Sequence, residues 1–251
     1  MHPIGRLHLL TIAFGLSGLV THAAEVRVLS AGAVEPGLHA FAQEAKRATG
    51  HDLVVQFNTA PQIARRLAAG ETYDMLIAPP AAITQADKDG KVAIDTRAPV
   101  GRVGAGIIVR AGAAAPAVAS VDQLKAALLA ADSVVYNTAS TGIYLDRLFE
   151  KMGVLDAIKP KTTRYPDGAS VLEHVIKGKG TEIGFDAITE IRLYEPKGLR
   201  MVGPLPADVQ NYTSYEAVLM VGAKAPEAVR EVLRLLASPA GKAAFVSGGV
   251  E

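Results

Sequence analysis

Short apolar runs alternate with segments of helical spacing early in this chain, and this alternation restricts the fold more than any other feature. Apolar runs that favour β-structure lie at residues 26–30, 53–57 and 75–78. Between them, hydrophobic residues recur at three- and four-residue intervals over 38–48 and 63–68, and a glycine follows each segment. This strand–helix order predicts a parallel sheet with helices on its faces.

The same alternation continues to the end of the chain. Further strands are predicted at 103–109, 134–136, 161–165, 182–185 and 215–221. Further helices are predicted at 124–129, 142–152, 171–176 and 227–236, with another beginning at Ser238-Pro239. The sequence therefore predicts an α/β protein throughout.

The first 23 residues have the order of a secretory signal. Arg6 is the one charged side chain among them, an apolar run follows from Leu9 to Val20, and Thr21-His22-Ala23 offers small residues at a cleavage site. The run is shorter than the roughly 20 residues that a membrane-spanning helix needs. We expect cleavage after Ala23 or Ala24 and a mature protein in the bacterial periplasm.

Composition excludes several classes of protein. The chain has 26 Lys and Arg against 25 Asp and Glu, a balance that argues against nucleic acid as a partner. It has no cysteine, so disulfides, thiol nucleophiles and cysteine-bound metals are excluded. No phosphate-binding loop, metal-binding His pair or nucleophile elbow is present, and we expect neither a metal nor a cofactor. The sequence gives no signal for oligomers, so we expect a monomer.

Several stretches resemble the periplasmic molybdate-binding-protein-like family of type II solute-binding proteins. They occur in the family's order along nearly the whole mature chain, at residues 30–34, 62–78, 139–144, 178–185 and 235–245. The resemblance implies a two-lobed periplasmic-binding-protein-like (type II) fold with a ligand cleft between the lobes. It also implies one lobe of residues 24–101 plus 214–251, a second of residues 102–213, and a membrane permease of the ABC type as partner.

The chain departs from the molybdate-binding pattern where the family holds its oxyanion. Pro61 stands about where a serine is expected, Ala78-Pro79-Pro80 replaces a Ser-Ala-Asp sequence, and Phe185 follows Gly184 without the family's tyrosine nearby. The segment from Gly184 to Glu190 is similar to a divergent branch of the same family. That branch includes a periplasmic aconitate isomerase.

The predicted ligand contacts lie at the carboxyl ends of the parallel strands, where such folds bind ligands. Small and hydroxyl-bearing residues there lead into helices, whose free N–H groups and positive dipole ends hold anions without Lys or Arg. The candidate ligand-binding residues are Ser30, Ala31, Gly32, Asn58, Thr59, Ala139, Ser140, Thr141, Gly142, Ser170 and Asp186. For each Ser, Thr or Asn, helix capping alone is the alternative interpretation.

Three interpretations of Asp186 stay open: an exposed or hinge residue, a partner for a ligand amine, or the general base of a proton shift. Arg102 and Arg164 could balance charge in the cleft, and Tyr144 and Tyr194 could line it, although a surface or core position is the alternative for each.

Two functional hypotheses follow. The first is an extracytoplasmic solute-binding protein that delivers a small anion, an oxyanion or a carboxylate, to an ABC-type transporter. The second is a periplasmic isomerase of an unsaturated carboxylic acid on the same fold, with Asp186 as its catalytic residue and no cofactor.

Overall fold

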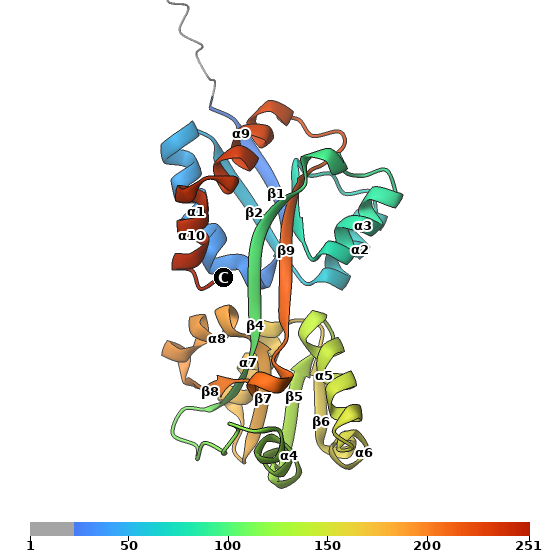
Figure 1. The fold of residues 1–251 in the computed structure, drawn as a ribbon, viewed down its shortest axis with the longest axis vertical. Helices are drawn as coiled ribbons and strands as arrows, with labels where there is room; N and C mark the ends of the chain where they lie inside the picture. The colour runs from blue at the N-terminus through green and yellow to red at the C-terminus, as the bar shows by residue number, and fades with distance from the viewer. Residues whose placement is uncertain (1–22) are drawn as a thin grey trace, which may run out of the picture.

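Two lobes stacked along the long axis of the molecule are joined by two long neighbouring strands. The computed structural model describes residues 23–251, and the expected signal segment lies outside them except for Ala23. Strands β4 (Ala98–Arg110) and β9 (Tyr212–Leu219) pair antiparallel and pass from one lobe to the other (Figure 1). The chain therefore crosses between the lobes twice.

The upper lobe in Figure 1 contains both ends of the described chain. Its elements are β1 (Glu25–Ala31), α1 (Glu35–Thr49), β2 (Asp52–Asn58), α2 (Ala60–Ala68), β3 (Met75–Ala78), α3 (Pro80–Lys88), α9 (Pro226–Ala237) and α10 (Pro239–Ser247). The lower lobe contains α4 (Val121–Ala130), β5 (Ser133–Asn137), α5 (Ser140–Lys151), α6 (Leu155–Ile158), β6 (Thr162–Tyr165), α7 (Gly168–Lys177), β7 (Glu182–Ala187), α8 (Ile188–Tyr194) and β8 (Leu199–Pro204). Short 3₁₀ turns lie at Gly32–Val34, Ile94–Thr96, Lys159–Lys161, Glu195–Lys197 and Ala207–Val209.

One continuous sheet runs through both lobes in the order β2-β1-β3-β9-β4-β7-β5-β6, and β8 pairs with β4. The strand β1 is parallel to β2 and β3, and β5 is parallel to β6 and β7. The crossing strands pair antiparallel with their neighbours. The carboxyl ends of the two parallel sets therefore meet where the lobes face each other.

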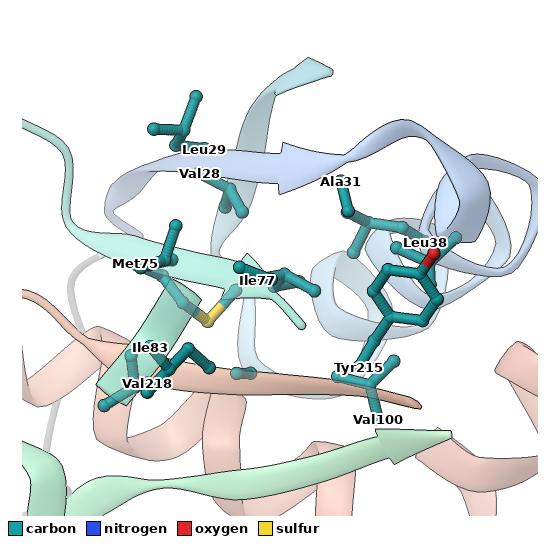
Figure 2. Close-up of a cluster of buried hydrophobic side chains, with 14 of the residues drawn as sticks. Val28, Leu29, Ala31, Leu38, Met75, Ile77, Ile83, Val100, Tyr215 and Val218 are labelled. Atoms are coloured by element: carbon teal, nitrogen blue, oxygen red, sulfur yellow. The ribbon is translucent and has the colours of Figure 1, made fainter. Parts of the chain in front are cut away.

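Each lobe has its own hydrophobic core. The larger core combines residues of the first part of the chain, up to Val103, with residues from Tyr215 to Val250, and Ala187 at the end of β7 joins it from the other lobe. Figure 2 shows side chains of β1 and β3 facing Val218 of β9 and Val100 of β4. The lower lobe is filled by clusters drawn from residues between 105 and 209. These cores agree with a first lobe built from both ends of the chain, while the lobe boundaries at residues 102 and 213 stay a prediction.

The structure adds elements that hydrophobic spacing does not predict. Helix α3 begins at Pro80, where a proline in the first turn starts a helix as well as ending the preceding strand. Helix α8 has seven residues, too few for a periodic pattern to be recognised. The crossing strand β4 begins at Ala98, five residues before the predicted start, because Ala98 to Gly104 pair with β9.

The carboxylate of Asp74 joins three separate segments of the upper lobe. It is 2% exposed and accepts hydrogen bonds from the backbone N–H groups of Arg27, at 2.8 Å, and Lys224, at 2.6 Å. We predict that Asp74→Ala lowers the free energy of unfolding by about 2–4 kcal/mol in urea denaturation, because two N–H groups lose their acceptor. The exposed Asp87→Ala on α3 is the control, and an equal effect of both changes would contradict this role.

Candidate functional site

A cavity lies where the carboxyl ends of the parallel strands of both lobes meet. Its walls come from the ends of β1, β2, β3, β5 and β7, and from the first residues of the helices that follow them. The lining residues are Ala31, Gly32, Ala33, Asn58, Thr59, Ala60, Pro79, Asn137, Ala139, Ser140, Thr141, Gly168, Asp186, Ala187, Glu190 and Tyr215. A second hollow shares five of these residues and adds Glu35, Phe57, Gln62, Asp167 and Ala169. We call the two together the cleft.

The start of α5 presents hydrogen-bond donors to the cleft. The side-chain oxygen Oδ1 of Asn137 accepts from the N–H groups of Ala139, at 2.9 Å, and Gly142, at 3.2 Å. The N–H groups of Ser140 and Thr141, between them, have no acceptor among the described residues. Because both residues line the cleft, these two N–H groups and their hydroxyls are available to an anionic group of a ligand.

Other helix starts contribute in the same way. Asp167 caps α7, and its carboxylate accepts from the N–H of Ser170 at 2.9 Å, which leaves Gly168 and Ala169 at the cleft. On the opposite lobe, Gly32 and Ala33 follow β1 and form the wall below α1. Because Gly32 has no side chain, a ligand in the cleft can approach the backbone here closely.

Two carboxyl groups meet in the cleft. Asp186 near the end of β7 is fully buried, and the half-buried Glu190 in α8 lies beside it, since oxygens of both carboxyls face Gly168. Because Oδ1 of Asn137 is held by two N–H donors, its Nδ2 must face Asp186, and it donates to Oδ1 of Asp186 at 3.0 Å. The other oxygen of Asp186, Oδ2, has no partner among residues 23–251.

Glycines leave the space that these carboxyls occupy. A Cβ atom on Gly168 would lie 2.2 Å from Oδ2 of Asp186 and 2.9 Å from Oε2 of Glu190. A Cβ atom on Gly32 would lie 2.8 Å from Oε1 of Glu190. The glycines of both lobes therefore contact the same carboxyl pair.

Burial raises the pKa of both carboxyls. Removal from water is the largest cause for Asp186, whose pKa rises to about 7. Burial also raises the pKa of Glu190 well above its usual value, and the negative charges of Asp186 and Glu35 raise it further. Two adjacent carboxyls in a poorly hydrated site cannot both ionise at low cost, so the pair retains a proton near neutral pH.

Nearby groups do not offset this negative charge. Glu35 and Asp167 lie at the edge of the cleft, and no lysine or arginine is among its lining residues in the described chain. The ring of Tyr215 reaches from β9 toward Ala31 and Leu38 (Figure 2). Burial raises the pKa of Tyr215, as do the charges of Glu190 and Asp186, so its phenol stays protonated.

The structure brings most of the predicted contact residues together. Those that line the cleft are Ala31, Gly32, Asn58, Thr59, Ala139, Ser140, Thr141 and Asp186. Asp186 is buried in the cleft, which leaves the interpretation of an exposed residue without support.

Three predicted contacts lie outside the lining residues. Ser30 is fully buried one residue before the end of β1, and its hydroxyl donates to the carbonyl of Ala31 at 3.1 Å. Gly142 packs against the carbonyl of Asn137, where a Cβ atom would lie 1.6 Å from that oxygen. Ser170 lies at the third position of α7, behind Gly168 and Ala169.

The two arginines considered as charge partners are engaged elsewhere. Arg164 forms an ion pair with Asp146 at 2.7 Å, lies over the ring of Tyr136 and donates to the backbone carbonyl of Asn137 at 3.0 Å, but it does not line the cleft itself. Arg102 lies over the ring of Tyr212 and pairs with Glu251 at 3.3 Å.

Neither of the two tyrosines considered lines the cleft. The hydroxyl of Tyr144 donates to the carbonyl of Val209 at 2.7 Å. The ring of Tyr194 is covered by the ammonium group of Lys197.

Eight residues that line the first cavity were not among the predicted contacts, and four of them matter most for its chemistry and packing. Asn137 and Gly168 belong to segments predicted at strand ends, but an internal capping amide and a packing glycine have no distinctive pattern. Glu190 lies four residues after Asp186, and nothing in the spacing shows that both face inward. Tyr215 appears in the sequence as an ordinary strand residue.

Two further classes of feature are absent from residues 23–251. No helix there is both long enough and apolar enough to span a bilayer. No group of three or more His, Cys, Asp or Glu side chains there is arranged to hold a metal ion.

Comparisons with known proteins agree with this architecture. A family model described as bacterial extracellular solute-binding protein matches residues 26–251. An aconitate isomerase from Pseudomonas sp is 29% identical over 230 residues, which are 89% of this chain and 86% of that protein.

Two solved structures share the fold. The sulfate-binding protein SubI from Mycobacterium tuberculosis H37Rv has a TM-score of 0.73 at 13% identity, covering 91% of this chain and 86% of that one. The periplasmic molybdate-binding protein of Azotobacter vinelandii has a TM-score of 0.72 at 14% identity, covering 90% and 98%. The predicted type II periplasmic-binding-protein-like fold and the family resemblance are confirmed.

We predict that Gly168→Ala destabilises the protein by about 1–3 kcal/mol, because the added methyl group overlaps the carboxyls of Asp186 and Glu190. Gly203→Ala is the matched control, since a Cβ atom there meets nothing within 4 Å. Urea denaturation measures both. Equal stabilities of the two variants would show that the carboxyls do not lie against Gly168.

Proposed function

The chain belongs to the family of bacterial extracellular solute-binding proteins, and from this premise we propose that it isomerises a small unsaturated organic acid held between its lobes. The observation that carries the proposal is the pair of adjacent carboxyls, the fully buried Asp186 and the half-buried Glu190, which line one cleft and whose pKa values are both raised. Paired carboxyls with raised pKa values are typical of sites that move protons.

Substrate carboxylates would be held by the helix starts. The free N–H groups and hydroxyls of Ser140 and Thr141 offer one anion-binding point, and the glycine backbone of Gly168 and Gly32 allows close approach from both lobes. These donors keep the ionised ends of the substrate apart from the acidic pair. The carbon chain between those ends would then lie over Asp186 and Glu190.

The proposed reaction is a proton shift along three carbons. The ionised member of the pair removes a proton from the saturated carbon beside the double bond, and the electrons of that C–H bond form a new double bond. The electrons of the old double bond take up a proton at its far end from the protonated member. The pair has then exchanged its roles but kept its single proton, which passes back from one carboxyl to the other before the next turnover.

The neutral-range pKa of Asp186 suits this role. A carboxylate with an ordinary pKa of about 4 is a weak base toward carbon, whereas a group with a pKa of about 7 removes protons more readily and is still about half ionised at neutral pH. The similarity to a Pseudomonas aconitate isomerase supports a tricarboxylic acid of this kind as substrate.

The second candidate function is delivery of a small anion, an oxyanion or a carboxylate, to an ABC-type membrane permease. The observation that favours it is the contact between the lobes: the hydroxyl of Thr189 in α8 donates to the carbonyl of Ala33 at 2.5 Å, beside the cleft. A bond that spans the lobes would favour a closed form around a ligand. In either case we propose a periplasmic protein whose signal is removed near Ala23.

We predict that the protein interconverts cis- and trans-aconitate in D₂O and introduces deuterium into the methylene group, as followed by proton NMR. Asp186→Asn and Glu190→Gln each lower the rate at least 10²-fold, since each removes one proton carrier. Asp122→Asn, an exposed change at the start of α4, is the control. Binding without deuterium incorporation in the wild type would instead favour the transport function.

A further inference from the structure

We infer that the cleft selects organic acids that bring their own hydrogen-bond donor, a hydroxyl or a retained proton, and rejects fully ionised tetrahedral oxyanions such as sulfate and molybdate. The inference rests on the proposed function, because it names the ligand class of the same cleft. It concerns binding alone and holds with or without turnover.

The first support is an excess of acceptors in the cleft. Oδ2 of the fully buried Asp186 has no donor among residues 23–251, and neither does the buried Oδ1 of Asn58, while the hydroxyl of Thr59 is the one buried donor in the cleft that also lacks a partner. The amide of Asn58 is oriented by Gln62, whose Oε1 accepts from Nδ2 of Asn58 at 3.4 Å and from the N–H of Thr59 at 2.7 Å. Both unpartnered acceptor oxygens belong to residues that line the cavity.

The second support is the shortage of protons on the acidic pair. Asp186 and Glu190 have four carboxyl oxygens between them, and one retained proton leaves most of these oxygens as acceptors. A sulfate or molybdate ion has only acceptor oxygens. It would place negative oxygens against those of the pair, and buried acceptors that meet acceptors are strongly unfavourable. A hydroxyl or hydrogen carboxylate, in contrast, donates to the oxygens that lack a partner.

The third support is the charge around the pair. The titratable groups that face it are Glu35 from α1, Asp167 at the start of α7 and the protonated phenol of Tyr215 from β9. No lysine or arginine among the described residues lines either part of the cleft. A dianion without a proton therefore finds only backbone N–H groups and hydroxyls on one side, and carboxyls on the other.

The test is a gain of binding. Molybdate and sulfate are titrated calorimetrically into the wild type, into the double variant Asp186→Asn/Glu190→Gln and into the control Asp122→Asn. The amides of the double variant remove the negative charge and supply N–H donors at the same place. We expect at least a 10-fold gain in affinity for one of the two ions in the double variant and none in the control.

Binding of either ion by the wild type as tightly as by the double variant would overturn the inference, as would the absence of any gain. If circular dichroism shows that the double variant is unfolded, the titrations are repeated with Glu190→Gln alone. Equal affinity of the wild type and this variant, or no gain in the variant, would again overturn the inference.

A second measurement uses the wild type only. We expect cis-aconitate to bind with uptake of up to about one proton at pH 8, measured from binding heats in two buffers of different ionisation enthalpy. Binding of cis-aconitate with no proton uptake would contradict the inference. If the protein binds organic acids in preference to sulfate and molybdate but does not isomerise aconitate, the proposed reaction is wrong and the inferred ligand class is still supported.

Discussion

The properties of the cleft depend on two carboxyl groups that lie side by side in it. Asp186 and Glu190 meet where β7 passes into α8, and no arginine or lysine among the cleft's described lining residues offsets their charge. Ionising both would place two like charges in a poorly hydrated space, so a proton remains on the pair near neutral pH. In the proposed reaction, this retained proton is the one that the pair moves.

The surrounding residues hold the pair in this state. Asn137 fixes Asp186 with one end of its amide and caps α5 with the other, which leaves Ser140 and Thr141 free for a ligand. Because burial raises the pKa of Asp186 to about 7, the folded protein binds this proton more tightly than the unfolded chain. This group therefore destabilises the fold progressively as pH rises from about 4 toward that value. Such a cost is typical of a functional site.

Hydrophobic spacing predicted the parallel strands and most helices, and the strand ends then predicted much of the cleft. Ala31 and Asn58 end β1 and β2, Ser140 begins the helix after β5, and strand ends meet at one edge of a sheet. Ser30 failed to reach the cleft because the strand continues one residue past it. Glu190 was missed because it lies in a seven-residue helix, where no periodic pattern separates an inward from an outward carboxylate. Which side chains meet in the cleft depends on tertiary contacts, and the spacing of hydrophobic residues along the sequence carries no information about those contacts.

The most direct test of this account is a carbon-13 NMR titration of the side-chain carboxyls in the ligand-free protein, with Asp186→Asn to assign the pair. The account predicts carboxyl resonances that titrate at about pH 7 or above and that change or vanish in the variant. A protein in which every aspartate and glutamate carboxyl titrates below about pH 5, near the ordinary range, would contradict a shared proton. The proposed chemistry and ligand class would then lose their common basis.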